Sequence, residues 1–286
     1  MAHLVSTRRR SSQEPGRELR PAQRGEAERP QRRWRPAAWW ITIGLVVTGL
    51  GLWQTLAEAG KLNLLFFPAP SVIARALGRS FASGTMLTDM GVTLRRVALG
   101  VLIGGGSGLV IGLLMGWLPT VRGVVDPLVA AVHPVPKVAL FPMFLILFGI
   151  GEWSKVAVIV ASTFFPMAIN SMTGVRQISP IAFEVARNYG AARWRIFSAI
   201  VVPGSLPVVA AGLRIAVNTA MVVTIAVELV GATNGLGARV WWAWQTLRTE
   251  DLYSTLLVVA AVGFVLNLIL DRARARIVRW QHDEQR

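Results

Sequence analysis

The feature that most constrains this chain is a series of long apolar runs. Several of them exceed the roughly 18–20 residues that an α-helix needs to cross a bilayer. The chain is 53% hydrophobic and only 16% charged, with a mean hydropathy of +0.50. Transmembrane β-strands would instead show short segments of alternating polarity. The sequence therefore predicts an all-α, polytopic membrane protein.

The apolar runs predict six transmembrane helices. A shorter amphipathic stretch, 72–81, predicts an external helix on the membrane surface with Ser71 as its N-cap. The six expected spans are about 38–56, 93–117, 124–148, 155–173, 206–230 and 252–270.

Positive charge is concentrated at the two ends of the chain. The net charge is +15, and all but three of the 30 basic residues are arginine. Arginines that flank apolar spans are typical of the positive-inside rule, which we favour over nucleic-acid binding. We therefore expect a disordered basic cytoplasmic tail at 1–36, a basic C-terminal tail at 276–286, both termini in the cytoplasm, and no nucleic-acid partner.

Glycine recurs every four residues in the second expected span. The ridge includes Gly104, Gly108 and Gly112, with Gly100 and Gly116 at its ends. In lipid, small residues at this spacing let a second helix approach closely. We favour helix packing over a role in substrate binding. The run is not a phosphate-binding loop, because no strand precedes it and no Lys-Ser/Thr pair follows it.

The third expected span is interrupted by His133-Pro134-Val135-Pro136-Lys137. Prolines break a helix and remove backbone donors. Irregular backbone persists in a membrane only where protein covers it or where it lines a cavity. Pro134, Pro136 and Lys137 are thus candidates for a solute path, with Asn218 of the fifth span as a weaker one. A kink without solute contact explains the break equally well.

A polar, basic stretch, residues 184–203, lies between the fourth and fifth spans. Glu184, Ala186, Gly190, Ile200 and Pro203 follow the spacing E-x-A, three residues, G, nine residues, I, two residues, P. Ala186 and Gly190 stand four residues apart, which predicts a small helical face that a partner can approach. Glu184 is expected near the helix N-terminus. A plain cytoplasmic loop marked by arginines is the alternative.

This stretch resembles the EAA loop of ABC-importer permeases, the element that docks on the ATPase. Val185 and Val202 depart from the usual Ala and Leu. Further motifs resemble the nitrate/sulfonate/taurine type of these permeases, and the likeness runs from about residue 65 to 280. They are Phe67-Pro68-Ala69-Pro70-Ser71, Pro134-Val135-Pro136-Lys137, Phe148-Gly149-Ile150-Gly151-Glu152 and Gly235-Leu236-Gly237.

The resemblance implies a type I importer fold in the inner membrane of a bacterium. A first transmembrane helix at 37–64 would precede a transmembrane domain at 65–275, with the docking loop at 174–205. The implied partners are a second permease subunit, which gives a homodimer, cytoplasmic ATPase subunits and an extracytoplasmic solute-binding protein. The implied solute is a small anion such as a sulfonate, taurine or nitrate, and the sequence does not identify which.

The chain itself is not expected to be an enzyme or to hold a cofactor. Gly60-Lys61 is followed by Leu62, so this site is not a P-loop. The three histidines are far apart in sequence and the chain has no cysteine, which argues against a metal site. An ion-gradient-driven secondary transporter is the main alternative, with His133, Lys137, Asn218 or Glu228 as relay groups. It leaves the docking motif unexplained.

Overall fold

The computed structural model describes residues 36–277, with side chains at residues 39–276. The chain divides into two compact units, residues 1–49 and 50–286. The boundary falls inside α1 (Pro36–Glu58), which ends before the expected residue 64. The segment Trp39–Glu58 is long and apolar enough to cross a membrane, and 6% of it is buried within the chain. Most of both expected tails lies outside the described residues. Only residue 36 of the tail at 1–36 and residues 276–277 of the tail at 276–286 are described.

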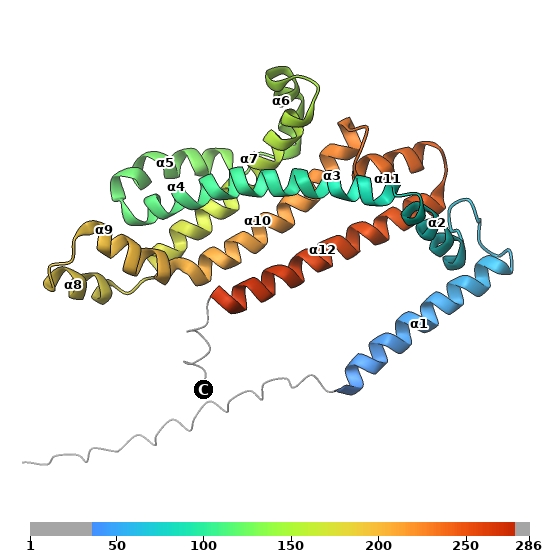
Figure 1. Ribbon diagram of the computed structural model, residues 1–286, viewed down its shortest axis with the longest axis horizontal. Helices are drawn as coiled ribbons and strands as arrows, with labels where there is room; N and C mark the ends of the chain where they lie inside the picture. Colours follow the sequence, from blue (N-terminus) through green and yellow to red (C-terminus); the bar gives the residue numbers. More distant parts are fainter. Residues whose placement is uncertain (1–35, 278–286) are drawn as a thin grey trace, which may run out of the picture. The chain divides into compact units, whose positions relative to one another are not determined.

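All regular structure in the described part of the second unit is helical (Figure 1). The elements after α1 are α2 (Pro70–Ala82), α3 (Thr85–Gly100), the π-helix η1 (Val101–Gly105), α4 (Gly106–Trp117), α5 (Pro119–Val132), the 3-10 helix η2 (Lys137–Leu140), α6 (Phe141–Phe148), α7 (Glu152–Arg176), α8 (Pro180–Asn188), α9 (Arg193–Ile196), the π-helix η3 (Phe197–Val201), α10 (Val202–Gly231), α11 (Leu236–Gln245) and α12 (Thr249–Ile277).

Five helical segments in the described chain are long and apolar enough to span a membrane, and a bent pair makes a sixth. The bent pair is Pro119–Val132 with Lys137–Phe148, at 90° to each other, so α6 points away from the line of α5 (Figure 1). Two spans are longer than hydropathy alone indicated. α3, η1 and α4 run on as Thr85–Trp117, and α9, η3 and α10 run on as Arg193–Gly231.

The centre of the second unit is α7, the most buried of the membrane-spanning helices. Both α4 and α10 lie along it (Figure 1). Val158 and Ile159 of α7 are fully buried and join Val227 of α10 in the main apolar core. Because lipid is as apolar as these side chains, close packing rather than exclusion from water stabilises this core.

The glycine ridge lies against α7. A Cβ atom at Gly108 would be 2.5 Å from the carbonyl oxygen of Phe164, and one at Gly104 or Gly112 would collide with the backbone of Val160 or Ala168. The backbones of the two helices are therefore too close for any other residue at these positions. The ridge faces protein rather than lipid.

The short helix α2 starts differently from the expectation. Its N-cap is Ala69, and Pro70 takes the first helical position, where a missing N–H costs nothing. Ser71 is therefore not the N-cap. It exchanges hydrogen bonds with Gln54 instead: its N–H donates to Oε1 at 3.1 Å, and Nε2 of Gln54 donates to its hydroxyl at 2.9 Å.

Candidate functional site

The segment that carries the docking signature folds as a short helix, a tight turn and the start of a long helix. α8 ends at Asn188, and Gly190 follows with φ +71°, a left-handed conformation that favours glycine. The N–H of Ala191 donates to Ala186 and the N–H of Gly190 donates to Arg187, both at 2.9 Å. This pair of bonds is the Schellman motif that terminates helices.

Gly190 is therefore a helix terminator, and the expectation that Ala186 and Gly190 share a helical face is wrong. Glu184 is exposed in the middle of α8 rather than in its first turn, which is a second correction. The loop is also shorter than the expected range 174–205. α7 continues to Arg176, and the next long helix already begins at Arg193.

Ile200 and Pro203 belong to that long helix. Ile200 is in the π-helical turn η3, and Pro203 is the second residue of α10. A π-turn has a wider hydrogen-bonding pattern than an α-helix, and a proline cannot donate to it. The second half of the signature thus lies in the helix that leads away from α8.

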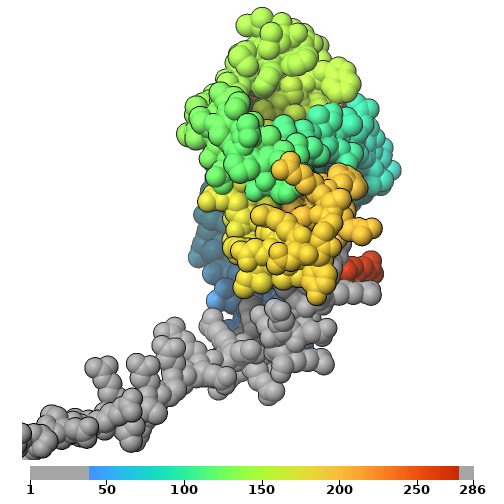
Figure 2. Space-filling model, turned by 90° about the vertical axis from the view of Figure 1, so that its left-hand side faces the viewer, coloured from blue at the N-terminus to red at the C-terminus, as the bar shows by residue number. Residues whose placement is uncertain are grey.

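Two hollows adjoin the face of α8 that carries Phe183 and Arg187. The first, of about 340 Å³, is lined by Glu184, Arg176 and Phe183 among others. The second, of about 430 Å³, is lined by Arg193, Ile196 and Phe183 among others, and Trp117 and Arg187 border both. Figure 2 views the molecule from this end, where α8 and α9 (gold) lie uncovered at the front. The arrangement offers an exposed helix with two basic, partly apolar hollows along one face.

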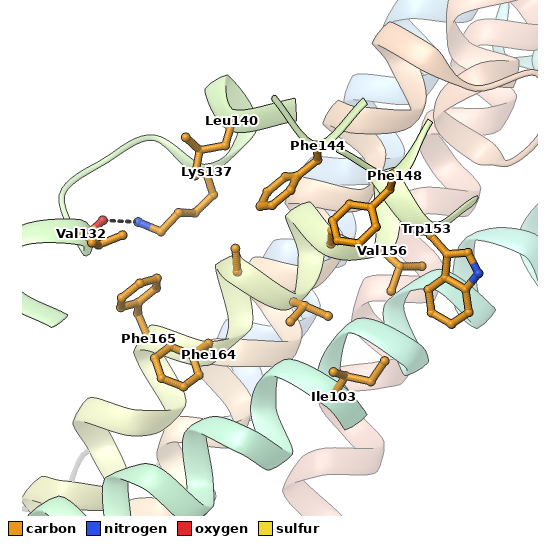
Figure 3. A pocket seen from close by; sticks show the side chains of 13 residues that line it. Ile103, Val132, Lys137, Leu140, Phe144, Phe148, Trp153, Val156, Phe164 and Phe165 are labelled. Carbon is orange, nitrogen blue, oxygen red and sulfur yellow. Dashed lines mark hydrogen bonds between the residues drawn. The ribbon is translucent and has the colours of Figure 1, made fainter. Parts of the chain in front are cut away.

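The break in the bent span is stabilised by its own lysine (Figure 3). Nζ of Lys137 donates to the carbonyl oxygens of Val132, His133 and Val135 at 2.9, 2.7 and 2.7 Å. It also lies 4.6 Å from the centre of the Phe165 ring. All three donors of the ammonium are therefore engaged with backbone carbonyls of the broken segment.

An apolar cavity of about 550 Å³ adjoins the break. Phe144, Phe148 and Trp153 approach it from one side and Phe164 and Phe165 from another (Figure 3). Among the described residues that line this cavity, Lys137 has the one charged side chain. The cavity therefore combines a large apolar wall with a single positive group.

Asn218 lies elsewhere. Its amide exchanges hydrogen bonds with Asn267 of α12, at 2.9 and 3.3 Å. Lys137 instead contacts its own broken segment and Phe165 of α7. The structure thus does not join the two candidates for the solute path in one site.

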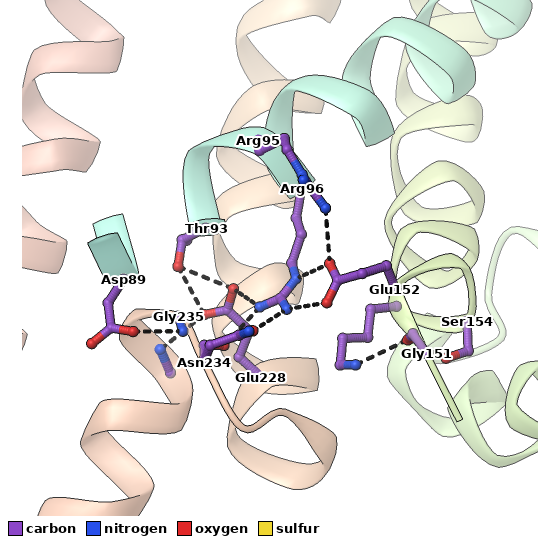
Figure 4. Close-up of polar contacts among 12 residues, drawn as sticks. Asp89, Thr93, Arg95, Arg96, Gly151, Glu152, Ser154, Glu228, Asn234 and Gly235 are labelled. Atoms are coloured by element: carbon purple, nitrogen blue, oxygen red, sulfur yellow. Dashed lines mark hydrogen bonds and ion pairs between the residues drawn. The ribbon is translucent and has the colours of Figure 1, made fainter. Parts of the chain in front are cut away.

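A buried ionic network, which the sequence analysis did not predict, joins residues of α3, α7, α10 and α11 (Figure 4). Arg96 of α3 is 1% exposed, and all five of its N–H donors are used. Nε and Nη2 donate to both carboxylate oxygens of Glu152 at 2.9 and 2.6 Å, and Nη1 donates to Glu228 at 2.7 Å. The remaining two donors bond Asn234, one to its backbone carbonyl at 2.8 Å and one to Oδ1 at 2.6 Å.

The carboxylate of Glu228 likewise has several hydrogen-bond partners. It also accepts hydrogen bonds from Thr93 and, at 2.9 Å, from the N–H of Gly237. Gly235 has φ +106°, and a Cβ there would lie 2.5 Å from Oε1 of Glu228. This explains the Gly235-Leu236-Gly237 motif, which fits the backbone around a buried carboxylate. Opposite charges in the second and fifth expected spans were the available signal, but charge alone does not show which of these residues meet.

Comparisons with known proteins give consistent results. The family model "Binding-protein-dependent transport system inner membrane component" matches residues 108–282. The taurine transport system permease protein TauC of Escherichia coli (strain K12) is 32% identical over 86% of this chain and 91% of its own length. A putative aliphatic sulfonates transport permease protein, SsuC of Bacillus subtilis (strain 168), is 27% identical over 92% of this chain and 95% of its own.

Two solved structures share the fold at low sequence identity. The inward-facing MetNI methionine ABC transporter matches with a TM-score of 0.54 and 16% identity, over 68% of this chain and 94% of that chain. An amino acid ABC transporter crystallised with histidines matches with a TM-score of 0.55 and 17% identity, over 71% and 97%. At this level of identity, these matches describe the fold alone.

Proposed function

We propose that this chain couples ATP hydrolysis in a partner subunit to solute movement, because it belongs to the family of binding-protein-dependent transport system inner membrane components. The chain is the permease subunit of an ABC importer, a multi-pass inner-membrane protein and a transport subunit rather than a catalyst. The resemblance to taurine and sulfonate permeases and the all-α membrane fold are thereby confirmed. An ion-driven transporter does not fit this family.

The exposed helix α8, with its two basic hollows, is the observation that carries the coupling proposal. The chain has no P-loop, so work from ATP must enter through a contact with another subunit. A helix that protrudes from the bundle fits a groove on a soluble partner. We assign this contact to cytoplasmic ATPase subunits, with Glu184 and Ala186 on the docking helix and Gly190 at its end. Ile200 and Pro203 carry the movement into α10.

The remaining partners and the orientation follow from the same proposal. A second copy of this chain completes the pathway, and a solute-binding protein delivers the solute from outside. Both termini then lie in the cytoplasm, on the side of α8. No nucleic-acid partner is required.

The proposed solute is a small organic sulfonate, and the first choice is taurine, whose sulfonate is its anionic group. The support comes from relatives that are named for taurine and aliphatic sulfonates. The cavity beside Lys137 adds a positive charge next to an apolar wall. Because the three N–H groups of Lys137 are already bonded, this charge would attract an anion with a hydrocarbon body without donating to it. We place the solute route along Pro134–Lys137.

The coupling proposal is tested with two variants at one position. A Cβ at Gly190 has open space around it but a strained φ, so Gly190→Ala and Gly190→Trp share the same strain and differ in bulk. We expect Gly190→Trp to abolish co-purification of the ATPase and ATP-dependent uptake, and Gly190→Ala to keep most of both. Glu184→Ala should weaken docking only slightly, because one exposed charge contributes little. Full ATPase association and uptake in Gly190→Trp would refute docking through α8.

A further inference from the structure

α10 and α12 share a row of polar side chains within their membrane-spanning parts. Nη1 of Arg214 donates to Asp271 at 2.9 Å, and Nε of Arg214 donates to Oδ1 of Asn267 at 3.2 Å. Nδ2 of Asn267 donates to Asn218 at 2.9 Å. We call these four residues the polar ladder. Each helix contributes two of them, four residues apart and therefore on one face.

The polar ladder is not enclosed by this chain. The side chains of Arg214 and Asp271 are 47% and 50% exposed, and Asn218 is exposed as well. Arg214 precedes Glu228 by 14 positions on α10, which places it about 21 Å from the buried ionic network, or about two thirds of a bilayer's hydrocarbon thickness. Ionisable groups at that depth avoid lipid and face a water-filled cavity or protein.

The ladder also has unused hydrogen-bonding capacity. Among the described residues, Nη2 of Arg214 has no acceptor and Oδ2 of Asp271 has no donor. Arg96 and Lys137 differ, because all of their donors are engaged. Arg214 is thus an intramembrane cation that is positioned by a neighbour and still able to bind an oxyanion.

We propose that the polar ladder is a solute-contact site, at which an oxyanion of the solute replaces the Asp271 carboxylate on Arg214. The inference rests on the proposed function and adds the residues that would recognise the anionic group. A guanidinium binds carboxylates and sulfonate-like oxyanions through parallel N–H bonds, whereas Asp271 uses only one N–H of Arg214. Exchange is easy because a half-exposed ion pair is weak. Asn267 accepts the Nε–H of Arg214 and so holds the guanidinium in place, whereas its own two amide N–H groups are bonded to Asn218 and Gly263. Asn218 uses one amide N–H on Asn267 and keeps the other for the solute.

Access to water is the first requirement, and cysteine labelling tests it. The chain has no native cysteine, so a single Asn218→Cys can be modified selectively by a small anionic methanethiosulfonate reagent. Val265→Cys is the matched control. Val265 is 50% exposed and only two residues from Asn267, but it lies on the other side of α12 in an apolar groove. We expect Asn218→Cys to react and Val265→Cys to remain unmodified in the complete importer in lipid nanodiscs. An unreactive Asn218→Cys would overturn the proposal.

Protection by taurine then separates an anion site from a structural clamp. We expect taurine to slow modification of Asn218→Cys, and Arg214→Gln to weaken this protection about tenfold, the effect of one hydrogen bond to a charged group. Asp271→Asn removes the competing carboxylate, so protection should be kept or enhanced. If the ladder only clamps α10 to α12, the two substitutions will act in the same direction, which would overturn the proposal.

Two controls keep this test distinct from that of the proposed function. Arg248→Gln removes an exposed arginine that pairs with Asp251 at 2.6 Å, outside the ladder, and should leave protection unchanged. ATP-dependent taurine uptake by the importer without these ladder substitutions is measured in parallel. Uptake without any taurine protection of Asn218→Cys would refute the ladder site alone. Absence of ATP-dependent uptake of taurine or ethanesulfonate would count against the proposed function.

Discussion

Arg95 and Arg96 are adjacent in sequence but have opposite environments, which makes them a matched pair of tests. Arg96 is buried with Glu152 and Glu228, whereas the side chain of Arg95 is 64% exposed and lies 3.7 Å from Glu152. Removing one partner of a buried ion pair costs about 3–5 kcal/mol, because the other charge stays buried without compensation. An exposed pair contributes at most about 1 kcal/mol. We expect Arg96→Met to lower the thermal unfolding midpoint in detergent strongly and Arg95→Met hardly at all. Equal shifts would contradict this account of the network.

Lys137 has two functions that substitutions can separate. Its ammonium caps three carbonyls at the break, and its charge faces the apolar cavity. We expect Lys137→Met to reduce solute uptake while ATPase association and basal ATP hydrolysis persist. Lys137→Arg keeps the charge and should retain more uptake than Lys137→Met. Unchanged uptake kinetics in Lys137→Met would exclude this cavity from the solute route.

Single residues were predictable from the sequence where one chemical property decides their placement. Prolines at 134 and 136 indicated the broken span, and the bend of 90° is at that point. The network around Arg96 was not predictable, because it joins residues 56 to 138 positions apart. No local pattern shows that Arg96, Glu152 and Glu228 meet at one end of the bundle.

At the scale of elements, the glycine ridge yields a test with an internal control. Gly108 and Gly112 contact the backbone of α7, while a Cβ at Gly106 of the same helix would meet nothing within 4 Å. Overpacking a close contact commonly costs about 1–3 kcal/mol. We expect Gly108→Leu and Gly112→Leu to lower the amount of folded protein in membranes, as measured by fluorescence-detected gel filtration. Gly106→Leu should be tolerated. A similar yield for all three would mean that α4 and α7 are not in close contact.

Hydropathy located the spans but not their internal geometry. The π-helical turns η1 and η3 continue the helices on either side of them, so apolar length alone cannot reveal them. The same limit explains the error at Gly190. A spacing of four residues fits a helical face, yet the positive φ of Gly190 places it after the helix has ended. Only the backbone conformation distinguishes these alternatives.

At the scale of the whole second unit, the candidate coupling surface and the ionic network are joined by the same two helices. α7 begins at the network with Glu152 and ends before α8, and α10 leads from the docking signature back to Glu228. The two helices that connect α8 to the network also pack along each other, so a movement of α8 would be expected to reach the network through them.

The orientation of the molecule gives the last prediction. Ile150 lies in the turn before α7 and is 94% exposed, and Tyr189 lies after α8 and is 88% exposed. One membrane-spanning helix, α7, separates them, so they must face opposite sides of the membrane. Arg187, Arg193 and Arg195 surround Tyr189 in sequence, and clustered arginines are retained in the cytoplasm. In intact cells, a membrane-impermeant thiol reagent should modify Ile150→Cys and leave Tyr189→Cys unmodified until the cells are permeabilised. The cysteine-free parent chain is the background for both variants. The opposite labelling pattern would place α8 outside the cell, away from ATP, and the coupling proposal would fail with it.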